Sequence, residues 1–136
     1  MTKISKNYRP DKKEKFMNAK MKEYFRLKLF NWKNELLRES SQTLVNLQKD
    51  ENTAKPDITD RASEETERSF ELRTRDRERK LINKINSALK KIEDGNYGYC
   101  EETGEPIGIK RLEARPIATL SIEAQEIHEK KERKLN

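Results

Sequence analysis

The sequence predicts a mainly α protein, in which a long antiparallel coiled-coil hairpin is followed by a small globular knob and a C-terminal helix. Of the 136 residues, 41% are charged and 32% hydrophobic, and only 4 Gly and 4 Pro interrupt the chain. Such a composition favours long helices and leaves room for one small domain at most. Two stretches also carry apolar residues at alternating steps of four and three, which is the pattern of a coiled-coil seam.

The chain opens with a Lys-rich arm over residues 1–18, which has little periodicity and which we expect to be a mobile arm or a short strap. A first helix is predicted over about residues 19–50. Its apolar seam steps by 4, 3 and 4 through Phe25, Leu29, Trp32 and Leu36. A helix with this seam must pack against a partner helix.

The partner is predicted to follow directly. Residues 52–59 contain Pro56 and small or polar side chains, so they form a turn with the hairpin tip near residues 53–62. A second helix then runs from about Asp60 to Asp94, with Gly95 as the residue after its C-cap. The hairpin therefore occupies residues 19–94. Its second seam is Leu81, Ile85, Ala88 and Ile92.

Opposed residues of an antiparallel hairpin have numbers with a constant sum, because each step along one helix is a step back along the other. Leu29 with Ile85 gives 114, as do Phe25 with Leu89 and Leu44 with Phe70. We therefore expect Phe70 to face Leu44 in the seam.

Residues 95–136 form the knob and the last helix. Aromatic residues and glycines between Tyr97 and Gly108 predict tight turns with short extended pieces, and a final helix starts near Ser121. The residues expected to pack the knob are Tyr97, Tyr99, Ile107, Ile109, Leu112, Pro116, Leu120 and Ile122.

The charge is unevenly distributed. The formal net charge is +6, but residues 1–49 hold 13 basic and 5 acidic groups (+8), whereas residues 50–60 hold 1 and 4 (−3). One hypothesis is therefore a basic coiled-coil protein that binds nucleic acid, although an acidic tip argues against it. No apolar run approaches the ~20 residues that span a bilayer, so we expect a soluble cytoplasmic protein without membrane partners. A single Cys excludes an internal disulfide.

Four segments together resemble one family, the bacterial DksA transcription factors that bind RNA polymerase. These segments are 57–63 (DITDRAS), 72–80 (LRTRDRERK), 97–100 (YGYC) and 107–116 (IGIKRLEARP). We expect a non-enzymatic protein, because the sequence holds no Ser/His/Asp set and no nucleotide-binding glycine loop, and a monomer, because the hairpin satisfies its own apolar seam. The resemblance implies a regulator whose hairpin tip enters the secondary channel of RNA polymerase. It also implies destabilised open promoter complexes at ribosomal RNA and amino-acid promoters, without direct sequence-specific DNA binding. Guanosine tetraphosphate is implied as a co-effector of this stringent response.

By this resemblance, Asp57, Asp60, Arg61 and Ala62 form the tip that acts at the polymerase active centre. The spacing of Asp57 and Asp60 also suits a capping box at the start of the second helix, and both roles are compatible. The family's rim contact falls on Arg77. Taken alone, the stretch 73–80 would be a solvated face with pairs such as Asp76–Lys80.

The guanosine tetraphosphate pocket of the family falls on Leu81, Lys84 and Arg115, whereas Gln125 replaces a lysine. The family's zinc ligands fall on Cys100, Thr103, Ser121 and Ala124, so three of the four cysteines are replaced. We therefore predict a degenerate zinc-finger-like knob that holds no zinc. Ser121 is free to cap the last helix instead.

Overall fold

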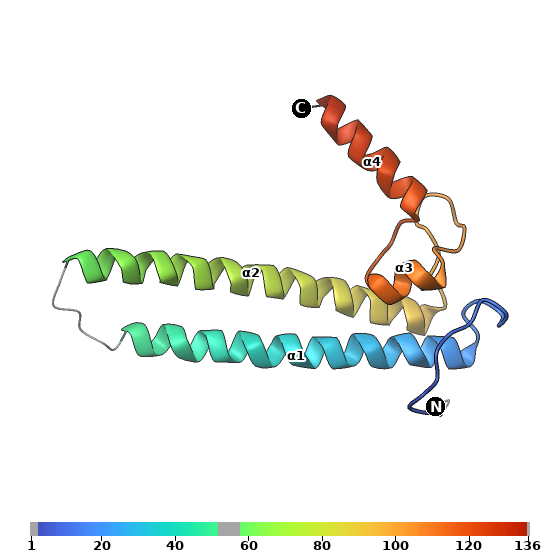
Figure 1. Ribbon diagram of the computed structural model, residues 1–136, viewed down its shortest axis with the longest axis horizontal. Helices are drawn as coiled ribbons and strands as arrows, with labels where there is room; N and C mark the ends of the chain where they lie inside the picture. The colour runs from blue at the N-terminus through green and yellow to red at the C-terminus, as the bar shows by residue number, and fades with distance from the viewer. Residues whose placement is uncertain (1–2, 52–57, 136) are drawn as a thin grey trace. The chain divides into compact units, whose positions relative to one another are not determined.

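The computed structural model describes residues 3–51 and 58–135, and it gives the backbone alone for residues 43, 47, 49–51, 58–62 and 135. The helices of this part of the chain are α1 (Ala19–Glu51), α2 (Ile58–Asp94), α3 (Ile109–Ala114) and α4 (Ile122–Leu135) (Figure 1). Between them, the described residues form turns and one isolated antiparallel bridge, from Tyr99 to Pro106. The mainly α prediction is confirmed. None of the described helices is long and apolar enough to cross a membrane.

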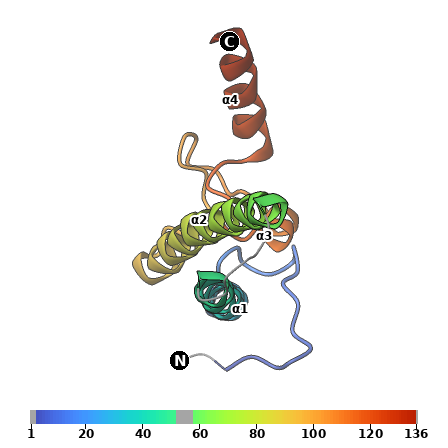
Figure 2. The same cartoon turned by 90° about the vertical axis from the view of Figure 1, so that its left-hand side faces the viewer.

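The chain forms two compact units. The base unit comprises Met1–Phe30 with Ile85–Asn136, and the distal unit comprises Asn31–Lys84. Within each unit, a stretch of α1 and a stretch of α2 lie side by side and run in opposite directions (Figures 1 and 2). The predicted antiparallel pairing is therefore confirmed, while the division into domains at residues 18 and 94 stays a prediction.

Local hydrogen bonds explain where the hairpin helices begin and end in the base unit. The Asn18 side chain accepts a hydrogen bond from the Met21 N–H at 2.8 Å and so caps α1. At the end of α2, the Asn96 N–H donates to the Lys91 carbonyl at 2.8 Å, and the Gly95 N–H donates to Ile92. Gly95 has a φ of 86°, which glycine adopts without strain. This Schellman motif confirms the predicted role of Gly95.

The core of the protein lies in the base unit. Phe25 and Leu29 of α1 are fully buried there, as are Ile85 of α2 and Leu112 of α3. The Phe25 ring also packs against Tyr97, with 5.7 Å between centroids. Each fully buried large apolar side chain stabilises the fold by roughly 1.5–3 kcal/mol. The predicted proximal seam is thus confirmed at Phe25, Leu29 and Ile85.

The N-terminal arm is a strap on this core. Phe16 makes an edge-to-face contact with Tyr99, with 5.4 Å between ring centroids, and Met17 is buried. Gly98 permits this contact, because a Cβ atom there would lie 2.9 Å from Met17 Cε and 3.2 Å from Phe16 Cζ. The arm and the knob therefore fold as parts of one body.

The distal unit differs in its packing. Leu36 is the one buried apolar residue among its described side chains, and Phe70 is 69% exposed. The predicted pairing of Phe70 with Leu44 is therefore wrong. The neighbouring residue occupies the inward position instead, since Glu71 has a carboxylate oxygen that is buried without a hydrogen-bond partner. Glu71, rather than Phe70, points toward the protein interior.

Glu71 belongs to a series. Glu64 and Glu78 lie seven residues to either side of it, and each also buries one carboxylate oxygen without a partner. The same heptad position continues to Ile85, which is fully buried in the base unit. Three successive heptads of the seam thus carry glutamate where a coiled coil places an apolar residue.

The knob departs from the sequence-based expectation in two respects. Tyr97, Ile107, Leu112 and Pro116 are buried as predicted, whereas Tyr99 and Ile122 are exposed. Tyr99 lies outside the core because its ring packs on Phe16 of the strap. The six-residue helix α3 (Ile109–Ala114) was not predicted.

Candidate functional site

The predicted tip lies at the start of α2. Asp57 lies outside the described residues. Asp60, Arg61 and Ala62 belong to the first turns of α2, but their side chains lie outside the description. The helix begins at Ile58, and the predicted capping box of Asp57 and Asp60 lies outside the described side chains. The role of the tip residues stays a prediction.

An exposed basic face runs along α2 in the distal unit. Arg73, Arg77 and Lys84 are exposed on it, and none of the salt bridges between described residues involves them. The spacing predicts a pair between Asp76 and Lys80. Asp76 instead pairs with Arg79, with 3.5 Å between the charged atoms. The guanidinium group of Arg77 is therefore available to a partner.

The predicted nucleotide pocket draws on both units. Leu81 is half-buried and belongs to the distal unit together with Lys84, whereas Arg115 belongs to the base unit. Arg115 is exposed and ends α3, where its N–H donates to the Arg111 carbonyl at 2.7 Å. Gln125, on α4, donates a hydrogen bond to Glu129 at 3.4 Å. The grouping of Leu81, Lys84 and Arg115 into one pocket stays a prediction.

The segment around Arg115 is fixed by a polar cluster that the sequence did not reveal. Lys28 Nζ donates to the Glu113 carboxylate at 2.8 Å and to its carbonyl at 2.9 Å. Although burial opposes the shift, hydrogen bonds from Lys28 and Tyr24 lower the pKa of Glu113. Burial and the bond to Glu113 raise the pKa of Tyr24 to about 12. The cluster attaches α3 to α1 across 85 residues of sequence.

A second set of hydrogen bonds shapes the chain after α3. The Tyr97 hydroxyl donates to the Pro116 carbonyl at 2.7 Å, and burial raises the pKa of Tyr97. Arg111 Nε donates to the Leu120 carbonyl at 2.9 Å. These bonds satisfy carbonyl groups in a segment that has no regular secondary structure, so they hold the loop between α3 and α4 in one conformation.

The positions of the family's zinc ligands converge in the base unit. Cys100 and Ala124 are both only 2% exposed. The hydroxyl of Ser121 accepts a hydrogen bond from the Ala124 N–H at 3.2 Å, so Ser121 caps α4. Hydrogen bonds from the Thr103 side chain and from the backbone N–H of Ser121 lower the pKa of Cys100 to about 6.

These residues do not fit a structural zinc ion, which takes four Cys or His ligands. Ala124 has no donor atom, the Ser121 hydroxyl is engaged in its cap, and the Cys100 sulfur accepts several hydrogen bonds. Elsewhere in the described part of the chain, no group of three or more His, Cys, Asp or Glu side chains is placed to hold a metal. His128, on α4, contacts the Glu102 carboxylate instead.

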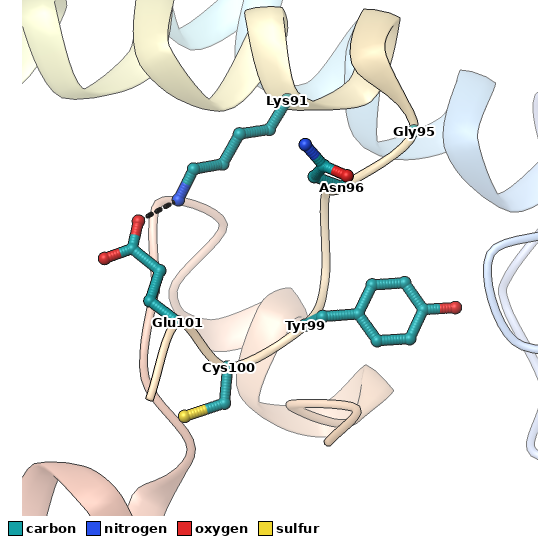
Figure 3. Close-up of a pocket in the computed structure, with 6 residues that line it drawn as sticks. All are labelled: Lys91, Gly95, Asn96, Tyr99, Cys100 and Glu101. Atoms are coloured by element: carbon teal, nitrogen blue, oxygen red, sulfur yellow. Dashed lines mark hydrogen bonds and ion pairs between the residues drawn. The ribbon is translucent and has the colours of Figure 1, made fainter. Parts of the chain in front are cut away.

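An open cleft of about 530 Å³ lies beside Cys100, which is one of its lining residues. Figure 3 shows Lys91 reaching across it to form an ion pair with Glu101, while the Cys100 sulfur points away from Lys91. The other lining residues are Gly95, Asn96 and Tyr99. This ion pair joins the end of α2 to the knob.

Comparison with known proteins covers most of the chain. Residues 21–92 match the profile of the N-terminal domain of the DnaK suppressor protein DksA, and residues 95–130 match the prokaryotic DksA/TraR C4-type zinc finger. The RNA polymerase-binding transcription factor DksA of Caulobacter vibrioides is 63% identical over 128 residues, or 93% of this chain and 89% of the relative. The protein of that name from Escherichia coli K12 is 48% identical over 122 residues, or 90% and 80%.

A solved structure agrees with these matches. The transcription factor DksA2 from Pseudomonas aeruginosa superposes with a TM-score of 0.81 at 42% identity, and the match covers 87% of this chain and 90% of that one.

Proposed function

Because this chain belongs to the DksA family, we propose that it is a transcription regulator that binds bacterial RNA polymerase directly. The observation that carries the proposal is the match along both the hairpin and the knob, residues 21–92 and 95–130. The Caulobacter and Escherichia relatives are named RNA polymerase-binding transcription factors. The family is not enzymatic, and neither is this chain.

The hairpin tip enters the secondary channel of the polymerase and destabilises open promoter complexes. Asp57 and Asp60 change the polar contacts around the polymerase's catalytic machinery, with Arg61 and Ala62 beside them. The exposed, highly charged surface of the distal unit supports this role, since a water-filled channel accepts polar side chains at little cost. Arg77 contacts the channel rim, which accords with its exposure.

Guanosine tetraphosphate strengthens the effect from a pocket between this protein and the polymerase. Leu81, Lys84 and Arg115 contribute to that pocket, and the two cations neutralise phosphate charge. Gln125 supplies an amide where the family has a lysine. Losing one charge-assisted contact weakens binding by about 1.5–3 kcal/mol, so the nucleotide effect is weaker than in a lysine-bearing relative.

The protein acts in the cytoplasm as a monomer, at ribosomal RNA and amino-acid promoters, and its knob works without zinc. The donor set at Cys100, Thr103, Ser121 and Ala124 supports the last point, because it leaves a metal too few ligands.

The test is transcription in vitro from a ribosomal RNA promoter with bacterial RNA polymerase. Wild-type protein is compared with the double variant Asp57→Asn/Asp60→Asn, with and without guanosine tetraphosphate and a zinc chelator. We expect wild type to inhibit in the presence of chelator, and the tip variant to bind polymerase but not inhibit.

Equal inhibition by the tip variant, together with salt-sensitive binding of DNA by the isolated protein, would contradict the tip mechanism. That result would favour the nucleic-acid hypothesis that the +8 charge of residues 1–49 raised.

A further inference from the structure

Phe70 is on the outside of a helix whose inner face carries glutamates. It is 69% exposed, the largest exposed fraction among the described large hydrophobic side chains, while Glu71 beside it buries a carboxylate oxygen without a partner. In a seam that served stability alone, the apolar ring would face inward and the carboxylate would face the solvent. Violations of the apolar-in, polar-out rule concentrate at functional sites.

The neighbours of Phe70 on the same face are cations. Arg73 and Arg77 follow at three and seven residues, and Lys84 lies seven residues further, which places all of them on one stripe of an α-helix. All three cations are exposed and outside the salt bridges between described residues. The Thr74 hydroxyl donates a hydrogen bond to the Phe70 carbonyl at 3.0 Å, so this hydroxyl is engaged within the helix itself.

The composition of this stripe is that of a protein-binding surface. Aromatic and arginine side chains dominate the binding energy of protein interfaces, where a ring fills a pocket and guanidinium groups pair with carboxylates. The stripe has no acidic residue between Phe70 and Lys84, because Asp76 lies on another side and pairs with Arg79. Its charge therefore fits an acidic surface with an apolar depression.

We propose that Phe70 is an apolar anchor of the surface through which α2 binds RNA polymerase, about two helical turns from the rim contact at Arg77. The stripe is continuous with Arg77, and this inference therefore rests on the proposed function. The occupant is the polymerase surface, in which carboxylates face Arg73 and Arg77 and an apolar depression receives the ring.

The variant Phe70→Ala tests the anchor, with Leu72→Ala as its matched control. Leu72 is also exposed, at 44%, but two residues along a helix place it about 200° around the axis from Phe70. Affinity for RNA polymerase is measured by titrating the polymerase into labelled full-length protein. We expect Phe70→Ala to weaken binding by about tenfold or more, as truncation of an interface anchor does, and Leu72→Ala to bind as wild type.

A third variant separates contact from folding. Phe70→Leu keeps an apolar side chain and is expected to recover part of the affinity, while the melting temperatures of all three variants match wild type because both positions are exposed. Equal affinities of wild type, Phe70→Ala and Leu72→Ala would overturn the anchor. Equal losses in Phe70→Ala and Leu72→Ala would also overturn it.

The proposed function fails by a different result. If wild-type protein does not bind polymerase, the function itself is wrong. If wild type and the Asp57→Asn/Asp60→Asn variant bind and Phe70→Ala binds equally well, only the anchor is wrong.

Discussion

The two units of this protein use their apolar residues in opposite ways. The base unit buries Phe25, Leu29 and Ile85 completely, whereas the distal unit exposes Phe70 and turns Glu71 inward. The same two helices run through both units. The difference shows that a single hairpin can bury its apolar side chains in one stretch and expose them in another.

The largest contrast is expected from truncating one apolar side chain in each unit. Phe25→Ala should lower the free energy of unfolding by about 3–5 kcal/mol, because a fully buried ring is lost. Val45→Ala in the distal unit, where Val45 is 42% exposed, should cost roughly 0.5 kcal/mol or less. Urea unfolding followed by circular dichroism measures both. Similar losses would remove the distinction between the units.

Next in size is the contact between the strap and the knob. Gly98→Ala combines a φ of 91° with a Cβ atom 2.9 Å from Met17, so it should destabilise the protein by about 2–4 kcal/mol. Gly104→Ala is the matched control, since its φ is 75° but nothing lies within 4 Å. We expect it to cost about 1–2 kcal/mol in the same unfolding experiment. Equal costs would mean that the close approach of the strap contributes nothing.

The distal seam should respond in the opposite direction. Glu71→Leu replaces a carboxylate that has a buried oxygen, so it should stabilise the protein by about 1 kcal/mol. Glu65→Leu is the control, because Glu65 is exposed on the outer side of α2. Thermal melting of both variants gives the comparison. A destabilised Glu71→Leu protein would show that the carboxylate has a favourable role in the seam.

The last effect depends on pH and concerns the base unit alone. Folding lowers the pKa of Cys100 from its ordinary value of 9.0 to about 6, so the thiolate is favoured in the folded state. Its contribution to stability is complete above pH 9.0 and is lost as pH falls toward 6. The melting temperature of wild type minus that of Cys100→Ser should therefore increase between these two values. Thr103→Val should reduce the increase, and a difference that is constant with pH would contradict the shifted pKa.

The sequence predicted the base of the hairpin well for a physical reason. Periodicity identifies buried positions where the residues are apolar, and Phe25, Leu29 and Ile85 obey it. At Phe70 the same rule fails, because its apolar side chain predicts a seam residue although Glu71 occupies that position. Hydrophobicity alone does not locate a seam that is made of glutamates.

The candidate site was predictable only where local rules apply. The cap by Ser121 and the turn at Gly95 follow from short-range preferences, and both are present. The bond from Lys28 to Glu113 joins residues 85 apart, and no local pattern signals it. The lowered pKa of Cys100 depends on the direction of hydrogen bonds from Thr103 and Ser121, which spacing does not determine.

The repeated glutamates also bear on helix register. Glu64, Glu71 and Glu78 are identical residues at seven-residue intervals. If α2 slid along its partner helix by one heptad, a glutamate would therefore move into a position that another glutamate had occupied. This part of the seam does not distinguish one alignment from the next. Ile85, a heptad further on, does distinguish them, because only it fits the dry core of the base unit. The heptad alignment of α2 is thus specified by Ile85 in the base unit and not by the glutamates of the distal unit.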